Sequence, residues 1–114
     1  MGKGLSKLQE GLLLMALGNV DNAVSDEARK EIFKKLHDRR DSDFELPHLT
    51  THEALQGCTH RGARVSISRA FKRLEERGLA KRFYQFQVSG HLLWSGINLT
   101  EEGRRVAKNL ISVG

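Results

Sequence analysis

Residues 63–77 place apolar and basic side chains on opposite faces of a predicted helix. The apolar face has the i, i+3, i+4 and i+7 spacing of a buried stripe, formed by Ile67, Ala70, Phe71 and Leu74. The opposite face carries Arg69, Lys72 and Arg73. Cationic groups on an exposed helix face suit phosphates and base edges, so these three residues are the first candidates for DNA contact.

The positive charge of the chain is concentrated around this helix. Residues 61–82 hold eight Lys or Arg residues against two Glu residues, a net charge of +6, whereas the whole chain of 114 residues carries +5. The remainder therefore sums to −1. A local excess of this kind is the footprint expected of a nucleic-acid contact, and a solvated basic face is the alternative.

Further candidates for DNA contact flank the central three. Ser66 and Ser68 are predicted hydrogen-bond donors near the helix start. Residues that approach a helix N-terminus combine side-chain charge with backbone N–H groups, which predicts phosphate contacts for Arg61 and Arg64. The same role is predicted for two residues after the helix, Lys81 and Arg82.

Ion pairing offers another interpretation of the basic residues near the end of the helix. Arg73 and Arg77 could pair with Glu75 or Glu76, or could simply be solvated. Arg77 also lies closer to the edge of the predicted core. It is therefore a weaker candidate than Arg73.

Two helices are expected before this region, over residues 5–18 and 25–36. The first runs from about Ser6 to Leu17 and ends at Gly18-Asn19, with a predicted apolar stripe of Leu5, Leu8, Leu12 and Met15, widened by Leu13 and Ala16. The second has Ser25 as its N-cap, and its predicted apolar face is Ala28, Ile32 and Leu36, with Phe33 expected to widen it. The polar residues 37–43 are interpreted as a flexible connection.

Residues 49–82 are predicted to form a helix-turn-helix. Thr50 and Glu53 stand at capping-box spacing, and the short helix they begin ends at Gly57. The basic helix follows, and Gly78 is well placed as the residue that ends it. Helix, turn and basic helix follow in the order of DNA-binding helix-turn-helix proteins.

A β-hairpin is predicted over residues 80–99. Tyr84, Phe86 and Val88 alternate with polar residues, and Ser89-Gly90 offers a turn. Gly96 is expected to permit a bulge in the return strand. A last helix over residues 100–112 has as its predicted apolar face Val106, Ala107, Leu110 and Ile111.

Two motifs in this order carry a family resemblance. The stretch from Ser68 to Leu79, SRAFKRLEERGL, followed by LTEEG from Leu99 to Gly103, resembles winged-helix transcription regulators, particularly MarR-like proteins. The expected fold is therefore mainly α with a small β-hairpin, a single winged helix-turn-helix domain over residues 1–114. The resemblance implies that the basic helix enters the DNA major groove, that the hairpin is the wing, and that the protein acts as a dimer. The segment from Gly57 to Arg69 is longer than in typical relatives, which predicts an extra helical turn or a phosphate-binding loop.

The function expected from the residues and the resemblance is a sequence-specific, double-stranded-DNA-binding transcription regulator that acts as a homodimer. One short winged helix contacts few base pairs, and two-fold pairing doubles the site. The candidate interface residues are Leu8, Leu12, Ile32, Leu110 and Ile111. A replication or partition factor from a plasmid or virus would use the same DNA chemistry.

A different class of function is a winged-helix module for protein interaction. In that case the hairpin aromatics Tyr84, Phe86 and Trp94 would dock another protein, and the basic helix would be a solvated face. Packing in the core is the preferred interpretation of these three aromatics.

Metal binding, catalysis and membrane insertion are not expected. His48, His52, Cys58 and His60 lie within thirteen residues, but Pro47 and the Thr50 cap place His48 before the helix and break the spacing of a zinc site. Cys58 is expected to pack as a small hydrophobe, and His52 and His91 to face solvent. The sequence singles out no cofactor, no nucleophile with a base, and no effector. The lone cysteine and the absence of a signal-peptide or spanning pattern predict a cytoplasmic protein.

Overall fold

The computed structural model describes residues 4–21, 23–36, 46–86 and 89–113, and the predicted flexible connection at 37–43 lies outside them. Within the described residues the chain is mainly helical with a small antiparallel sheet, as predicted. The elements in chain order are α1 (Lys7–Asp21), α2 (Ala23–Leu36), β1 (Leu49–Thr50), α3 (Thr51–Leu55), α4 (Arg61–Glu76), β2 (Ala80–Phe86), β3 (Leu92–Leu99) and α5 (Glu101–Val113). This arrangement is compatible with a winged helix.

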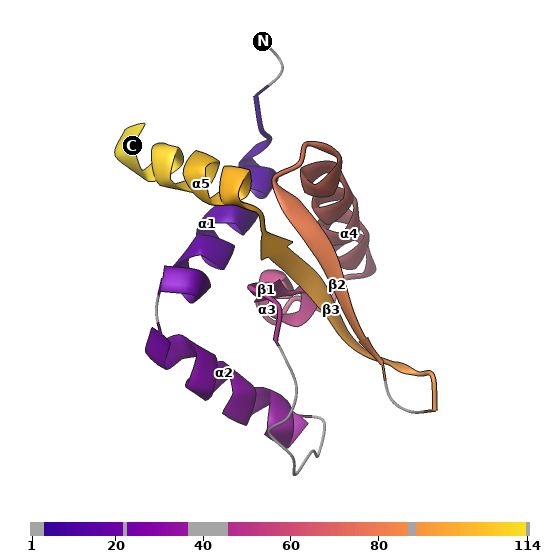
Figure 1. The fold of residues 1–114 in the computed structure, drawn as a ribbon. Helices are drawn as coiled ribbons and strands as arrows, with labels where there is room; N and C mark the ends of the chain where they lie inside the picture. The colour runs from indigo at the N-terminus through magenta and orange to yellow at the C-terminus, as the bar shows by residue number, and fades with distance from the viewer. Residues whose placement is uncertain (1–3, 22, 37–45, 87–88, 114) are drawn as a thin grey trace.

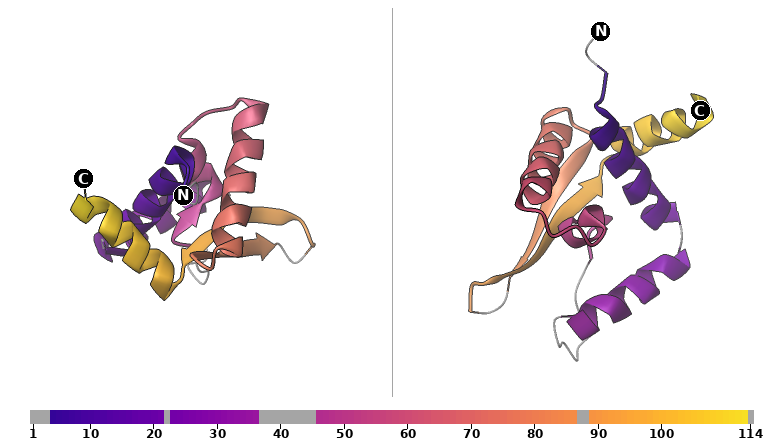
Figure 2. Two further views of the ribbon diagram at one scale, coloured as in Figure 1. Left: turned by 90° about the horizontal axis from the view of Figure 1, so that it is seen from above. Right: turned by 180° about the vertical axis from the view of Figure 1, so that it is seen from behind.

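The sheet has the strand order β1-β3-β2, with all neighbours antiparallel. The β2–β3 hairpin begins beside α4 and projects beyond the helices, while α1 and α5 pack together at the other end of the sheet (Figure 1). Helix α2 continues from α1 away from this packed region, as the view from behind in Figure 2 shows. The basic helix and the hairpin therefore lie next to each other at one side of the molecule.

The core joins α1, α4, α5 and the sheet. The predicted buried face of α4 is confirmed, because each of its four apolar residues is at most 5% exposed: Ile67, Ala70, Phe71 and Leu74. They pack in one cluster with α1 residues Leu12, Leu13, Ala16 and Leu17 and with sheet residues Leu49, Ile97 and Leu99. Burial of these apolar surfaces, the main favourable term in folding, fixes which face α4 turns outward.

The first two helices differ from their predicted bounds. Helix α1 continues through Gly18-Asn19 to Asp21, and α2 begins at Ala23, so Ser25 lies inside the helix and is not its N-cap. Asn19 does not stop α1 because its side-chain amide donates a hydrogen bond to the His48 carbonyl oxygen at 2.8 Å. The predicted stripe is also rotated, since Leu8 is exposed and Gln9 is buried.

The buried face of α2 was predicted wrongly in part. Ala28 and Ile32 are exposed, and Arg29 is buried instead; Phe33, which was expected to widen the apolar face, is buried as predicted. The side chain of Leu36, the third residue of the predicted face, lies outside the described side chains. The Arg29 guanidinium forms a salt bridge with Glu53 of α3, and the Phe33 ring meets the Trp94 ring edge-on at 5.6 Å. The Phe33 ring also meets the His52 ring of α3 edge-on at 5.9 Å, so α2 docks through the Arg29 ion pair and the aromatic contacts of Phe33.

Strand β1 was not predicted, and it explains Gly96. Gly96 pairs regularly with both Thr50 and Phe83, and the irregularity in the hairpin lies at Gln85–Phe86, so the predicted bulge at Gly96 is wrong. A Cβ atom at Gly96 would lie 2.1 Å from the Leu49 carbonyl oxygen. Glycine is needed here because the β1 backbone passes so close.

The LTEEG motif joins the end of α4 to the start of α5. The Thr100 hydroxyl donates to the Gly78 carbonyl oxygen at 2.7 Å and accepts from the Gly103 N–H at 3.0 Å. A Cβ atom at Gly103 would lie 1.9 Å from the Leu79 carbonyl oxygen. The predicted inward face of α5 is confirmed at Ala107, with Val106 and Leu110 partly buried against the core. Ile111 is exposed because it lies beyond these contacts near the helix end.

Candidate nucleic-acid interface

Helix α3 is positioned by the predicted capping box. The Thr50 hydroxyl accepts the Glu53 N–H at 3.1 Å, and the Glu53 carboxylate accepts the Thr50 N–H at 2.9 Å. Each side chain satisfies a backbone donor that the first helical turn leaves without a partner. Gln56 and Gly57 then adopt left-handed backbone angles, with φ of 51° and 81°, which end the helix and turn the chain toward α4.

Helix α4 begins two residues before the predicted start at residue 63. His60 caps it, since its Nδ1 accepts the Gly62 N–H at 3.0 Å. The long turn therefore adds two residues, Arg61 and Gly62, to the start of α4, which is less than the full extra turn that was predicted. At the other end Gly78 has φ of +75°, and the N–H groups of Gly78 and Leu79 donate to the carbonyl oxygens of Glu75 and Leu74. This pattern is the Schellman motif, so the predicted helix end is confirmed.

The basic face of α4 is directed to solvent. The side chains of Arg69, Lys72 and Arg73 are exposed, as are those of Ser66 and Ser68. Within the described part of the chain, no ion pair or side-chain hydrogen bond forms at six of the predicted contact residues: Arg61, Arg64, Arg69, Lys72, Arg73 and Lys81. An exposed cation that no carboxylate neutralises is available to a phosphate.

One flank of α4 is connected to the hairpin. The Arg82 guanidinium donates to the Ser68 hydroxyl at 3.4 Å, and the Arg82 N–H donates to the Glu75 carboxylate at 3.1 Å. These contacts hold the first part of β2 against the middle and end of α4. Arg82 and Ser68, both predicted to contact DNA, therefore lie together at the junction of helix and hairpin.

The other flank of α4 borders a groove under the N-terminal segment. Arg69, Arg73 and Arg77 recur every four residues and line this groove, whose volume is about 450 Å³. Its opposite wall is formed by Gly4, Ser6, Leu8 and Gln9. Arg77 therefore belongs to the basic surface, which the sequence had indicated only weakly.

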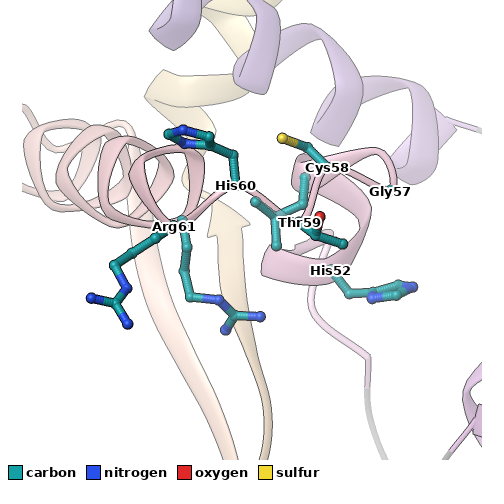
Figure 3. A pocket seen from close by; sticks show the side chains of 8 residues that line it. His52, Gly57, Cys58, Thr59, His60 and Arg61 are labelled. Carbon is teal, nitrogen blue, oxygen red and sulfur yellow. The ribbon is translucent and has the colours of Figure 1, made fainter.

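A second, smaller cavity of about 290 Å³ lies at the turn between α3 and α4 (Figure 3). Arg61 and Arg64 line one side of it, and His52 and Cys58 line the other. In Figure 3 the side chains of His60 and Arg61 leave the start of α4 in opposite directions. Cys58 is exposed, so its predicted burial is wrong, because the turn holds it outside the core.

The histidines and Cys58 do not form a metal centre among the described residues, where no three potential ligands come together. His52 and His91 are exposed, as predicted. The His48 ring is used structurally, since its Nδ1 accepts the Leu99 N–H at 2.8 Å. Burial, together with the charges of Arg104 and Arg29, holds the pKa of His48 below its ordinary value.

The salt bridge between α2 and α3 stabilises the position of the capping box. Glu53 receives two hydrogen bonds from the Arg29 guanidinium, at 2.6 and 2.8 Å, and the same guanidinium donates to the Pro47 carbonyl oxygen at 2.6 Å. Burial alone would raise the pKa of Glu53, but the hydrogen bonds from Arg29 and Thr50 and the charge of Arg29 hold it below its ordinary value.

The hairpin aromatics divide into two groups. Trp94 is buried against Phe33, which confirms core packing for this residue. Tyr84 and Phe86 are 45% and 54% exposed, so the prediction that they pack in the core is wrong. Both residues lie in the second half of β2, and the β2–β3 hairpin projects past the helices (Figure 1).

The candidate dimer surface is partly corrected. Leu12 is 2% exposed and belongs to the core, so it is not available to a partner in this structure. Leu8, Ile32 and Ile111 are exposed, and Leu110 is half-buried. Among the described residues no helix is long and apolar enough to cross a membrane.

Comparison of the chain with protein-family models, with curated proteins and with solved structures gives no match. The function is therefore inferred from the residues and their geometry.

Proposed function

We propose that this protein is a winged helix-turn-helix protein that binds double-stranded DNA, with α4 as the helix that enters the major groove. The observation that carries the proposal is the outward face of α4. Arg69, Lys72 and Arg73 lie on it opposite a fully packed apolar face, and no described side chain neutralises them. A helix of this size fits the major groove, where arginine and lysine recognise guanine and bind phosphates.

The surrounding elements support the same proposal. Helix α3 and its left-handed turn precede α4 as the first helix precedes the second in a helix-turn-helix, and the hairpin lies next to α4 in the position of a wing. Arg61 and Arg64 at the start of α4 and Lys81 after its end extend the positive surface. In this arrangement they bind the phosphate backbone on either side of the groove.

The proposal includes a cytoplasmic, homodimeric transcription regulator resembling MarR-like proteins. Two copies related by a two-fold axis would present two α4 helices to a palindromic site. Exposed Leu8, Ile32 and Ile111 supply apolar surface for the contact between copies. A replication or partition protein would bind DNA through the same face.

Charge reversal tests the α4 assignment. The double variant Arg69→Glu/Arg73→Glu should lose duplex binding in fluorescence anisotropy and keep its helical circular dichroism, because both side chains point away from the core. The matched control is Arg105→Glu/Lys108→Glu, which makes the same change in net charge on the exposed face of α5. Duplex affinity that falls equally in both variants, or in neither, would show that α4 is not the DNA-binding surface.

A further inference from the structure

The β2–β3 hairpin presents two large aromatic rings to solvent. The Tyr84 and Phe86 rings have centroids 6.3 Å apart and planes inclined by 22°. By contrast, Phe33, Phe71 and Trp94 are buried. Neighbouring exposed aromatic rings indicate a binding surface, because a folded chain gains nothing by leaving them in water.

The aromatic pair continues the surface that begins at α4. Residues 82, 84 and 86 alternate along β2 and share one face of the strand. The Arg82 guanidinium lies 5.5 Å from the centre of the Tyr84 ring and also donates to Ser68 of α4. Leu92, which pairs with Phe86 across the hairpin, is exposed too. We call Arg82, Tyr84 and Phe86 the hairpin ladder.

Charge around the hairpin ladder favours an anionic partner. Residues 77–100 contain Arg77, Lys81 and Arg82 and no Asp or Glu. The Glu75 carboxylate, which accepts the Arg82 N–H, offsets one of these three charges, so the surface stays positive. A partner that combines negative charge with planar apolar groups fits both the cations and the rings. Nucleic acid has this combination only where its bases are unpaired and their faces are accessible.

The spacing of the rings also favours an unstacked strand. Successive bases in a duplex strand are about 3.4 Å apart, whereas the two ring centres are 6.3 Å apart. Two bases that stack on the two rings must therefore be separated from each other. We propose that the hairpin ladder is a stacking platform for unpaired bases of single-stranded DNA, with Arg82 beside the rings to bind the phosphates. This site is distinct from the face of α4 proposed for duplex DNA.

Fluorescence anisotropy of the full chain with a labelled oligothymidylate, which cannot pair with itself, tests this site. Replacement of an aromatic residue that stacks on a base should weaken binding by about 5- to 150-fold for each residue. We therefore expect this loss in Tyr84→Ala and in Phe86→Ala. Tyr84→Phe keeps the ring and should bind as tightly as the unmodified protein.

The variant Tyr84→Leu/Phe86→Leu separates base stacking from general apolar contact. It retains apolar surface and remains suited to a strand, so it should fold yet lose binding as the alanine variants do. Wild-type affinity in this variant would overturn the proposal, as would failure of the unmodified protein to bind oligothymidylate. Alanine variants that change the oligomeric state and leave oligothymidylate binding intact would assign the rings to a protein contact instead.

The two DNA-binding sites can fail separately. Arg69→Glu/Arg73→Glu should lose duplex binding and still bind oligothymidylate. Tyr84→Ala/Phe86→Ala should lose oligothymidylate binding and still bind duplex DNA. Parallel loss of both ligands in both variants would contradict a separate site on the hairpin.

Discussion

Removal of the Arg29 side chain should destabilise the protein strongly, although Arg29 is a charged residue on the peripheral helix α2. Among the described residues, its guanidinium donates two hydrogen bonds to Glu53 and one to the Pro47 carbonyl oxygen. The side chains of Arg29 and Glu53 are only 9% and 21% exposed. Arg29→Ala therefore leaves a largely buried carboxylate without its cation.

The expected cost follows from that burial. Loss of one partner of a buried ion pair costs about 3 to 5 kcal/mol, and the partial exposure of Glu53 places Arg29→Ala near the lower value, about 3 kcal/mol. For a domain of this size that corresponds to a fall in Tm of about 10 °C. Urea and thermal unfolding followed by circular dichroism measure both quantities.

Two further variants make this test specific. Arg105→Ala removes an ion pair with Glu102 whose side chains are 64% and 50% exposed, and it should leave the stability unchanged. Arg29→Ala/Glu53→Gln should recover part of the loss, because the amide keeps the cap on Thr50 without a buried charge. If Arg29→Ala lowered the free energy of unfolding by less than about 1 kcal/mol, the conclusion that the Arg29–Glu53 ion pair stabilises the contact between α2 and α3 would be refuted.

Three further predictions concern the core and pH. Gly103→Ala should unfold or strongly destabilise the protein, because its Cβ would lie 1.9 Å from the Leu79 carbonyl oxygen. By contrast, Gly18 lies in the last turn of α1, where an added Cβ meets nothing within 4 Å, so Gly18→Ala should raise the stability by up to about 1 kcal/mol in thermal unfolding. Phe71→Ala should cost about 3 to 5 kcal/mol in urea unfolding, and a negligible loss would mean that α4 faces the other way. The pKa of His48 is lowered in the folded protein, so the unfolded chain binds a proton at this residue more readily than the folded chain does. Neutral His48 therefore contributes to the free energy of unfolding. That contribution is complete above about pH 6.5 and is lost as the pH falls through the pKa of the folded state. His48→Asn, which keeps an acceptor for the Leu99 N–H, should remove that part of the pH dependence, and an unchanged profile would exclude His48 as its source.

Local signals in the sequence predicted the elements that carry the basic face. The four apolar residues of α4 identified its buried side, and Thr50, Glu53 and Gly78 identified helix ends through side-chain and backbone preferences that act within a few residues. Such preferences survive in the folded chain when packing agrees with them. The DNA-binding candidates were placed on α4 and next to it for the same reason.

Local sequence patterns could not predict the contacts between residues that are far apart in the chain. The bond from Asn19 to His48 and the salt bridge from Arg29 to Glu53 join residues far apart in the chain, and they changed the end of α1 and the buried face of α2. Strand β1 has only two residues and shows no periodicity, so Gly96 was interpreted as a bulge. The exposure of Tyr84 and Phe86 depends on how far the hairpin projects, which alternation alone does not fix.

The salt dependence of duplex affinity tests the role of α4 most directly. A protein that neutralises phosphates shows a linear fall of log K with log salt concentration, with a slope of about −0.9 for each phosphate contact. We predict such a fall for the unmodified protein and a slope shallower by about 1.8 in Arg69→Ala/Arg73→Ala if each arginine binds one phosphate. No duplex binding at low salt, or the same slope and affinity in the variant, would contradict the proposal that α4 binds DNA.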